Sequence, residues 1–421
     1  QMNTAQTNQP QGCSLIFSPS LLSAALAAFV TLSLGAPDAT QARTIVVPPD
    51  AELQAVIDSA HSGDTLLLPA VTFVAKPRKF TESLCGNCEE HQTEVKASYG
   101  FRVRGKSLTI VGSGRKGTEL VTRAGYGLFF VNSQNSYVSD LSITGGRRDS
   151  DGNATDAGIV ARYSRVTIER VEIRNNKRTD TSVVVGIGGI FGREGAELYI
   201  RDCRIINNTW DGIALYRGAS ATVTDCIIKN GRGAGIGVTW DATCVALRNE
   251  ISGYWKGIGS FGTSWVIARN NLVHHNLGWG MVGTGESYMD MSNNVIFANG
   301  NCGVAAWGST SRGRMVNNII SENGWREQWV CPCVGVWNYG DWAKWEFTHN
   351  IVWQNKDGEY QDIWDQTDMS GNLNVDPLFA DTLSFHLSSG SPAIDAGSEK
   401  LSDPDGSRSD IGLTGGPKAK K

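Results

Sequence analysis

Charged and aromatic side chains that could move protons recur at similar intervals between residues 193 and 341. Lys and Arg can act as bases or cations, Tyr can act as an acid, and paired carboxylates can act as acid and base. The candidate catalytic residues are Lys256, Arg217, Arg193, Tyr216, Asp211 and Asp241. The candidate binding residues are Trp210, Trp240, Trp255, Trp279, Glu286, Trp307, Trp337 and Tyr339.

This mixture of side chains suits a sugar polymer as ligand. Aromatic faces stack against pyranose rings, while carboxylates, guanidinium and ammonium groups bond hydroxyls or carboxylates. The structural alternative is that each Trp covers a strand edge and each charge is an ordinary surface charge. Both interpretations stay open from the sequence.

A short acidic segment offers hard oxygen ligands at alternating positions. Asp149, Asp151, Asn153 and Asp156 surround the turn residue Gly152. Calcium prefers such oxygen ligands, although this segment lacks the length and the final Glu of an EF-hand. A calcium site is therefore one hypothesis, and an Asx-rich turn is the other.

The elements that must position these groups repeat along the chain. The repeat is marked by one position per unit, spaced 22 to 24 residues apart with two steps of 32: Val171, Cys203, Cys226, Asn249, Asn271, Asn294, Asn318, Asn350 and Asn372. A fixed period of this length predicts stacked coils, in which each unit delivers a short strand to the same face. We interpret the Asn column as structural, because stacked amides can bond to one another.

Composition narrows the class of protein. The 421 residues include 49 Gly, and only 19% are charged, which fits many tight turns and short strands. The net charge of -4 gives no basic footprint, so nucleic acid is not an expected partner. The sequence leaves the oligomeric state open.

The first 42 residues predict a leader. Residues 21–35 form an apolar stretch followed by small residues, which is typical of a signal peptide and short for a membrane span. We therefore expect an extracellular or periplasmic protein with no stable membrane span. Among nine Cys, Cys85 and Cys88 predict a loop disulfide or free thiols, and Cys331 or Cys333 could bridge to Cys302 in the previous coil.

Three segments carry a family resemblance. They are the helical plug AELQAVIDSAHSGDTLLLP, the coils NNLVHHN, NNVIFANG and NNIISENG, and the terminal DPLFADTLSFHLSSGSPAIDAGS. Residues 44–412 resemble the right-handed parallel β-helix proteins of the pectate-lyase-like superfamily. The resemblance implies an all-β solenoid over 43–412, with a cap containing a short helix at about 44–69 and a C-terminal cap at about 373–412. Residues 413–421 are expected to be a disordered tail.

The resemblance also bounds the function. The superfamily includes lyases, epimerases, hydrolases and non-enzymatic members, and its substrates usually lie along the stacked first strands. The Asn-Thr-Asp, Asp-Asp and Gly-His-Gly signatures of the hydrolases and the Asp-Pro-His-Asp motif of the epimerases are absent. The sequence therefore favours a secreted polysaccharide lyase that acts by β-elimination on a uronate-containing glycan, with Ca²⁺ as candidate cofactor. A glycoside hydrolase and a non-catalytic glycan-binding surface protein are the alternatives.

Overall fold

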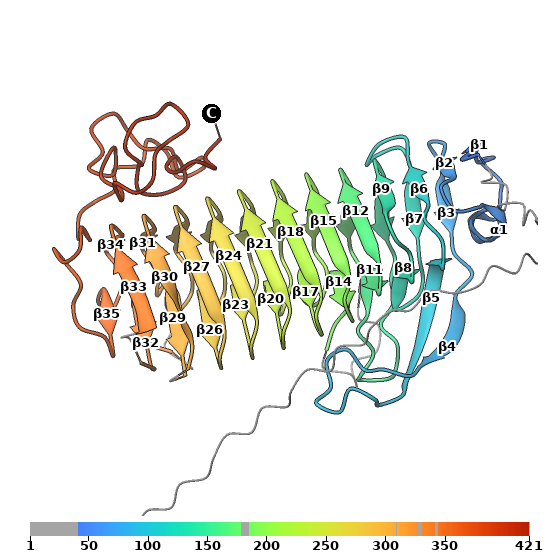
Figure 1. Ribbon diagram of the computed structural model, residues 1–421, viewed down its shortest axis with the longest axis horizontal. Helices are drawn as coiled ribbons and strands as arrows, with labels where there is room; N and C mark the ends of the chain where they lie inside the picture. Colours follow the sequence, from blue (N-terminus) through green and yellow to red (C-terminus); the bar gives the residue numbers. More distant parts are fainter. Residues whose placement is uncertain (1–40, 178–184, 309, 327–330, 342–343, 421) are drawn as a thin grey trace, which may run out of the picture. The chain divides into compact units, whose positions relative to one another are not determined.

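The computed structural model describes residues 41–177, 185–308, 310–326, 331–341 and 344–420 (Figure 1). The expected leader, residues 1–42, lies outside these residues except for its last two. None of the helices in the described part of the chain is long and apolar enough to cross a membrane.

Three sheets, here named A, B and C, run the length of the described coils, and their strands pair in parallel except for the first strand of sheet C. Sheet A contains β1 (Thr44–Val46), β2 (Thr65–Leu67), β6 (Thr109–Val111), β9 (Ser136–Ser139), β12 (Arg165–Glu169), β15 (Glu197–Arg201), β18 (Ser220–Thr224), β21 (Thr243–Leu247), β24 (Trp265–Arg269), β27 (Tyr288–Ser292), β30 (Arg312–Val316) and β33 (Trp345–Thr348). Sheet B contains β3 (Thr72–Val74), β7 (Glu119–Val121), β10 (Ser142–Thr144), β13 (Glu172–Arg174), β16 (Arg204–Ile206), β19 (Ile227–Lys229), β22 (Glu250–Ser252), β25 (Leu272–His274), β28 (Val295–Phe297), β31 (Ile319–Ser321) and β34 (Ile351–Trp353). Sheet C contains β4 (Arg78–Glu82), β5 (Val95–Arg104), β8 (Tyr126–Val131), β11 (Ala157–Arg162), β14 (Gly188–Arg193), β17 (Ile213–Leu215), β20 (Ala234–Val238), β23 (Lys256–Ser260), β26 (Trp279–Thr284), β29 (Val304–Trp307), β32 (Val336–Asn338) and β35 (Tyr360–Gln361).

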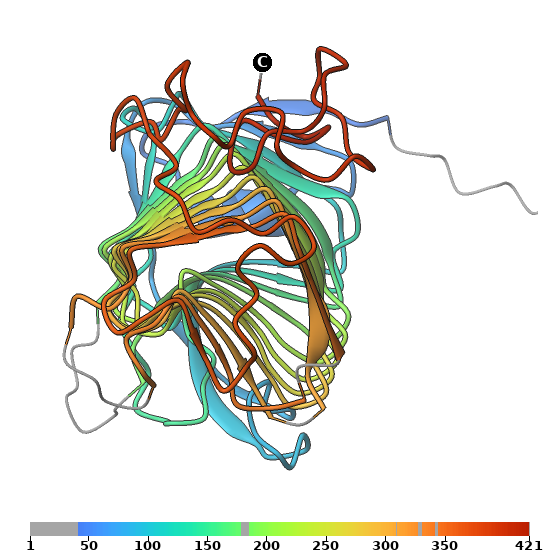
Figure 2. The same ribbon diagram turned by 90° about the vertical axis from the view of Figure 1, so that its left-hand side faces the viewer.

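Each coil passes through sheets C, A and B in turn, so the all-β, right-handed parallel β-helix prediction is confirmed. Seen end-on, successive coils superpose around a common interior (Figure 2). Equivalent residues pair between coils, as Ile213 does with Ile236 and Ile236 with Ile258. These three side chains point inward and are fully buried in one continuous core. The repeat therefore becomes a stack because each coil buries its apolar residues against the next.

The predicted Asn ladder stands at the corner between sheets A and B. Asn271 donates from Nδ2 to Oδ1 of Asn294 at 3.0 Å and to the carbonyl of Ala246 at 2.9 Å. The same contacts join the ladder from Asn249 to Asn372. The preceding residue in each coil, such as Asn270 with φ of 54°, has a left-handed conformation that makes the corner sharp.

A second amide ladder, which we did not predict, stands at the corner between sheets B and C. Asn276 donates to Asn299 at 2.9 Å, and Asn299 donates to Asn323 at the same distance. The ladder ends at Asn355. In the coil before Asn276, Tyr254 takes the equivalent position in place of an Asn. Its ring is fully buried, and its amide donates to the side chain of Asn276.

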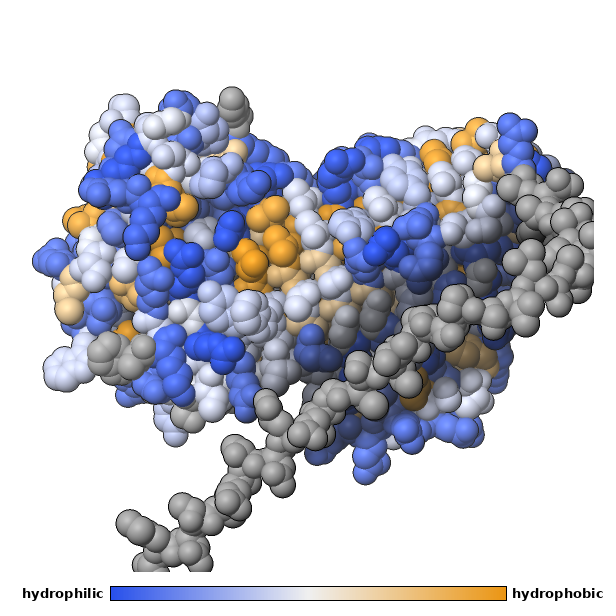
Figure 3. All heavy atoms as spheres, in the orientation of Figure 1, coloured by the Kyte–Doolittle hydropathy of each residue, from blue (hydrophilic) through white to orange (hydrophobic). Residues whose placement is uncertain are grey.

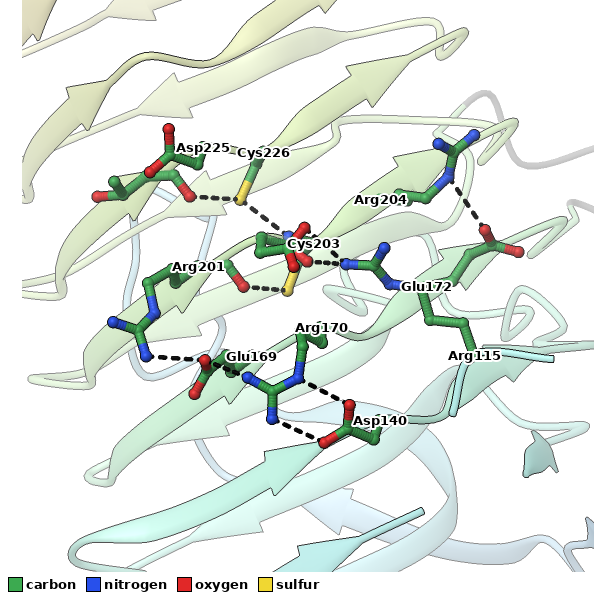
Figure 4. Close-up of polar contacts among 12 residues, drawn as sticks. Arg115, Asp140, Glu169, Arg170, Glu172, Arg201, Cys203, Arg204, Asp225 and Cys226 are labelled. Atoms are coloured by element: carbon green, nitrogen blue, oxygen red, sulfur yellow. Dashed lines mark hydrogen bonds and ion pairs between the residues drawn. The ribbon is translucent and has the colours of Figure 1, made fainter. Parts of the chain in front are cut away.

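Ion pairs cross between coils on the outside of the corner between sheets A and B. Arg170 bonds both oxygens of Asp140, at 2.7 and 2.8 Å, and also pairs with Glu169 (Figure 4). Cys203 and Cys226 occupy equivalent positions in consecutive coils beside these pairs. Hydrophilic residues cover most of the face in Figure 3, with an apolar patch near the middle of the coils.

The N-terminal cap has the expected short helix, α1 (Leu53–Ser59), between β1 and β2. Leu53 and Ile57 are buried in the main core. The Gln54 side chain bonds the backbone of Arg102 in both directions, at 2.7 and 3.0 Å, so it pairs with the exposed edge of β5. The helix therefore covers the first coil and satisfies its backbone.

The C-terminal segment, which was expected to form a cap at about 373–412, packs against one of the three sheets. Residues 373–420 pack against the outer surface of sheet B, where Phe385, Ala393 and Ile411 cover Val295 and Ile319. The expected disordered tail also contacts this surface, since Arg248 donates to the carbonyl of Lys418 at 3.2 Å. The outward apolar residues of β28 and β31 explain this arrangement, because they need cover.

An excursion between β3 and β5 covers part of the outer face of sheet C. Its strand β4 pairs antiparallel with β5, and a disulfide joins Cys85 and Cys88, as one of the two predicted alternatives had it. Cys85 and Phe80 pack over Tyr126, Phe129 and other outward residues of β8 to β17 in a second apolar cluster. The outer face of sheet C is therefore roofed over its first coils.

Candidate active site

The predicted site residues lie along sheet C but at two opposite edges of it. At the start of the strands lie Trp210, Asp211, Trp255, Lys256 and Trp279. At their ends and in the turns that follow lie Arg193, Tyr216, Arg217, Trp240, Asp241, Glu286, Trp307 and Tyr339. The sequence placed both groups on one face. In the structure their backbone positions lie at opposite ends of the strands, but some side chains bridge this distance: the Trp279 and Trp307 ring centres are 5.9 Å apart, and the Tyr216 ring lies 5.9 Å from that of Phe191 within β14.

Asp211, Lys256 and Tyr216 form the group with the clearest means of moving a proton. Asp211 precedes β17, and its Oδ1 accepts a hydrogen bond from the Ala234 amide at 2.6 Å. Ala234 pairs with Lys256 on the next strand, β23. The charge of Asp211 interacts with both Lys256 and Tyr216. Asp211 and Tyr216 flank β17 in one coil, and Lys256 begins β23 two coils further on, with Ala234 in the coil between them.

Glycines form the floor of this area. A Cβ at Gly233 would lie 1.8 Å from Oδ1 of Asp211, so only glycine lets this carboxylate lie against the coil. A Cβ at Gly237 would lie 3.7 Å from the other carboxylate oxygen, and a Cβ at Gly259 would meet the Phe261 ring at 2.5 Å. Such glycines allow a ring or a ligand to approach the backbone closely.

Burial sets the protonation of the three groups. It raises the pKa of Asp211 to about 6, although the Ala234 amide opposes the shift. It lowers the pKa of Lys256, whose ammonium lies 5.5 Å from the Phe261 ring centre and 5.7 Å from that of Trp279, while Asp211 opposes this shift. It raises the pKa of Tyr216 well above its usual value, so the phenol stays protonated. The group thus holds an amine inclined to lose its proton and a phenol inclined to keep one.

The predicted Trp residues of the later coils form a continuous aromatic cluster. Ring centres are 6.3 Å apart for Trp255 and Trp279, 5.9 Å for Trp279 and Trp307, and 5.7 Å for Trp307 and Trp337. Trp279 and Trp337 are buried, and Trp337 donates to Asp362 at 2.8 Å, so these two pack within the protein. Tyr339, in ring contact with Trp337, is 62% exposed. Trp255, Trp307 and Tyr339 are therefore the members that a ligand can reach.

A cavity of about 790 Å³ lies at the other edge of the sheet, along the turns that lead to sheet A. Four predicted residues line it: Arg217, Trp240, Asp241 and Glu286. The Arg217 guanidinium lies 4.1 Å from the Trp240 ring centre and also donates to the Cys88 carbonyl of the excursion. This pocket combines a flat cation–aromatic wall with carboxylates, which suits polyhydroxylated ligands.

The pocket also contains residues that the sequence did not indicate. His91 reaches it from the excursion, held by a contact between its Nδ1 and the Cys85 carbonyl at 3.1 Å. Tyr163 comes from an earlier coil whose turn has the same place as that of Trp240. Repeat spacing could have indicated Tyr163, but no spacing places a residue of the excursion.

Arg193 is not available as a catalytic group. Its guanidinium is fully buried and donates to Glu82 at 2.6 Å, to Glu194 at 3.0 Å and to Thr155 at 2.7 Å. Glu82 is the last residue of β4, so the excursion covers the Arg193 guanidinium. Trp210 likewise packs against this apolar cluster, beside a space of only about 50 Å³.

The predicted calcium loop does not fit a metal. Asp149 accepts from the amide and hydroxyl of Ser98, and Asp156 accepts from Arg148 at 2.5 Å. Asp151 accepts from the amides of Lys96 and Asn153, whose own side chain is exposed. Within the described residues, no three His, Cys, Asp or Glu side chains are arranged to hold a metal ion. The carboxylates of the loop therefore bind residues of β5 and the guanidinium of Arg148.

Comparisons with known proteins agree with this architecture. No curated protein matches the chain. The solved structure of pectate lyase Pel9A has a TM-score of 0.53 at 14% identity, covering 88% of this chain and 96% of that one. The A-module of mannuronan C-5 epimerase AlgE4 from Azotobacter vinelandii has a TM-score of 0.46 at 17% identity, covering 76% of this chain and 89% of that one.

An alginate lyase from Paenibacillus sp. str. FPU-7 is also similar, with a TM-score of 0.34 at 14% identity over 59% of this chain and 93% of that one. At these identities the likeness concerns the fold. The model of the right-handed beta helix region matches residues 86–251 and 188–356, which together exceed half of the chain. With its three stacked parallel sheets, the chain belongs to the right-handed beta helix family.

Proposed function

We propose that the protein is a polysaccharide lyase that cleaves a uronate-containing glycan by β-elimination. The observation that carries the proposal is Lys256: a partly buried lysine with a lowered pKa, beside a carboxylate and two aromatic rings, on the outer face of a β-helix. A lysine whose pKa is lowered loses its proton more readily and can serve as a general base. Similarity of fold to a pectate lyase supports the choice of a uronate substrate.

The elimination assigns one step to each group. The unprotonated Lys256 amine removes the proton from C5 of the uronate, and the electron pair forms the C4–C5 double bond as the C4–O4 bond breaks. We assign the donation to the departing O4 to Tyr216, which burial keeps protonated; its ring packs in the apolar cluster under the excursion, so substrate binding must expose its hydroxyl. Burial lowers the pKa of the Lys256 amine, and the charge of Asp211 opposes this shift.

Binding is divided between the two edges of the sheet. The glycine floor at Gly237 and Gly259 lets a sugar ring approach the backbone near Lys256. Trp255, Trp307 and Tyr339 offer aromatic faces to further sugars. The pocket lined by Arg217 and Trp240 extends the surface towards sheet A and places a cation near substrate carboxylates.

The hydrolase alternative has less support. The raised pKa of Asp211 suits a general acid, but its predicted partner Asp241 lies beyond the far end of β20. Strand β20 alone spans about 13 Å, whereas paired catalytic carboxylates stand about 5–9.5 Å apart. A non-catalytic glycan-binding protein would use the same aromatic faces and is tested below.

We also propose that the protein acts outside the cytoplasm. The Cys85–Cys88 disulfide favours an oxidising compartment, which agrees with the leader predicted from residues 1–42. An extracellular or periplasmic enzyme would meet its polymer there. Fractionation of cells that produce the full chain tests this location.

The test is an assay on pectate, alginate and neutral polysaccharides, each with added calcium and with chelator. Elimination gives an unsaturated product with new ultraviolet absorbance together with new reducing ends. Reducing ends without absorbance would mean hydrolysis, and retained binding without cleavage would mean a binding module. The calcium arms show whether a metal offsets the substrate carboxylate, as the candidate cofactor was expected to do.

Variants locate the activity. Lys256→Ala should reduce turnover about 10²–10⁴-fold, the usual contribution of a general base. Lys229→Ala is the matched control, because this lysine pairs with Glu250 on sheet B, away from the site. Equal activity of the two variants would remove Lys256 from the mechanism.

A further inference from the structure

Two buried thiols meet between consecutive coils at the edge of the aromatic cluster. Sγ of Cys302 lies 3.3 Å from Sγ of Cys331, and both residues are almost fully buried. They pack with Trp279, Val282 and Trp337. A disulfide has a sulfur separation of about 2.05 Å, so closure needs a movement of little more than 1 Å.

We propose that Cys302 and Cys331 form a disulfide under oxidising conditions, which fastens the connection before β32 to the previous coil. In the sequence this connection falls within the step from Asn318 to Asn350, one of the two longer steps of the repeat. Its last part supplies Val334 to the aromatic cluster. The inference is independent of the proposed catalytic activity.

The other nearby cysteine makes different contacts. Sγ of Cys333 donates to the carbonyl of Arg326 at 3.2 Å and accepts from Asn301 at 3.8 Å. Although Cys333 is only two residues from Cys331, its sulfur is therefore engaged elsewhere. The pairing is expected to be specific to Cys302 and Cys331.

The chain contains its own comparison in Cys203 and Cys226. These two also lie in consecutive coils, but each thiol donates to backbone carbonyls, Cys203 to Arg201 at 3.3 Å and Cys226 to Thr224 at 3.3 Å (Figure 4). Their corner position belongs to the column that Asn occupies in later coils. We expect both to stay as thiols.

The oxidation needs an external disulfide reagent, such as glutathione disulfide. The Cys331 thiolate attacks one sulfur of the reagent, forms a mixed disulfide and releases one reagent thiolate. The Cys302 thiolate then attacks the Cys331 sulfur and releases the second, so two electrons pass from the cysteines to the reagent and both protons are given up. The hydrogen bond from Cys302 lowers the pKa of Cys331, which favours Cys331 as the first nucleophile.

The experiment is peptide mapping of the full chain. Protein equilibrated with glutathione disulfide, or with dithiothreitol, is denatured in an alkylating reagent, digested without reduction and analysed by mass spectrometry. We expect a cross-linked peptide pair containing Cys302 and Cys331 only in the oxidised sample, with Cys203, Cys226 and Cys333 alkylated. Alkylation of both Cys302 and Cys331 after oxidation, or a cross-link to Cys333, would overturn the proposal.

Two variants serve as controls. Cys333→Ser should retain the cross-link, whereas Cys302→Ser should lose it. Because reduction also opens the Cys85–Cys88 disulfide, the melting temperature of each protein is compared with and without reductant. Reduction should lower the melting temperature of the wild type by several degrees more than that of Cys302→Ser, and equal shifts would contradict a stabilising cross-link.

Discussion

The guanidinium of Arg193 and the carboxylate of Glu82 meet at 2.6 Å inside the protein, although 111 residues separate them in the chain. Glu82 also pairs with Arg162 at 2.5 Å and accepts from the Tyr126 hydroxyl at 2.6 Å. The contacts join the excursion to three coils of sheet C. These buried contacts attach the excursion firmly to the early coils of the helix.

Removal of Arg193 should therefore destabilise the protein strongly. Arg193→Met leaves Glu82 buried with one fewer partner, and breaking a buried pair typically lowers the free energy of unfolding by about 3–5 kcal/mol. Denaturant unfolding measures the loss. Arg165→Met is the control, because its pair with Glu197 is largely exposed and should change stability by less than about 1 kcal/mol. Similar losses in both variants would contradict the buried network.

The amide ladder should show a comparable sensitivity at positions that never meet a ligand. In Asn294→Ala, the Asn271 side chain loses its acceptor and the Ala268 carbonyl loses its donor. Each buried polar group left without a partner costs about 1–3 kcal/mol. Thermal unfolding measures the loss, and Asn153→Ala, whose side chain is exposed and whose backbone is not left-handed, should have little effect.

The pH dependence of activity tests the link between Asp211 and Lys256. The Asp211 charge raises the pKa of Lys256, so Asp211→Asn should lower that pKa further. The unprotonated amine then exists at lower pH, and the acidic limb of the kcat/KM profile should move to lower pH. Asp241→Asn, at the opposite edge of the sheet, should leave this limb in place. If the acidic limb does not move in Asp211→Asn, the charge of Asp211 does not influence the pKa of Lys256.

A buried carboxyl pair should make stability depend on pH. Burial raises the pKa of Asp156 from 3.8 to about 7, and it raises that of the neighbouring Asp149. Between these two values the folded protein holds a proton that the unfolded chain has lost, so stability falls as the pH rises from about 4 to 7. Asp156→Asn removes this titration.

Urea unfolding at several pH values checks the sign. The stability of Asp156→Asn relative to the wild type should increase from pH 4 to pH 7. Asp381 is the control, because hydrogen bonds from Ser384 lower its pKa. Its contribution to stability is present above the unfolded pKa and is lost as the pH falls, so Asp381→Asn should not show the same trend.

The sequence predicted the features of the fold that repeat. The spacing from Asn249 to Asn372 indicated the coils, and the inward positions followed from side-chain alternation along short strands. The second ladder was readable in the same way, because Asn276, Asn299 and Asn323 recur at steps of 23 and 24 residues. This column differs from the first in that Tyr254 takes the equivalent position in the preceding coil, which shortens its run of Asn.

The repeat pattern could not predict the features of the structure that occur only once. No periodicity places Glu82 against Arg193 or brings His91 to the pocket, since both come from the excursion. Likewise, the C-terminal segment covers sheet B because of apolar residues on β28 and β31 that alternation alone assigns to solvent. Long-range packing decided these positions.

The uniform coil-to-coil spacing has a consequence for how such a chain can change in length. Residues 226–248 run from one ladder position to the position just before the next, so their removal would join Asp225 to Asn249 and leave every remaining strand in phase. Loss of a single residue within a strand would instead turn its side chains to the opposite face. The chain can thus gain or lose material in whole layers, and Asp211 and Lys256, which come from different layers, would be respaced in increments of about 4.8 Å.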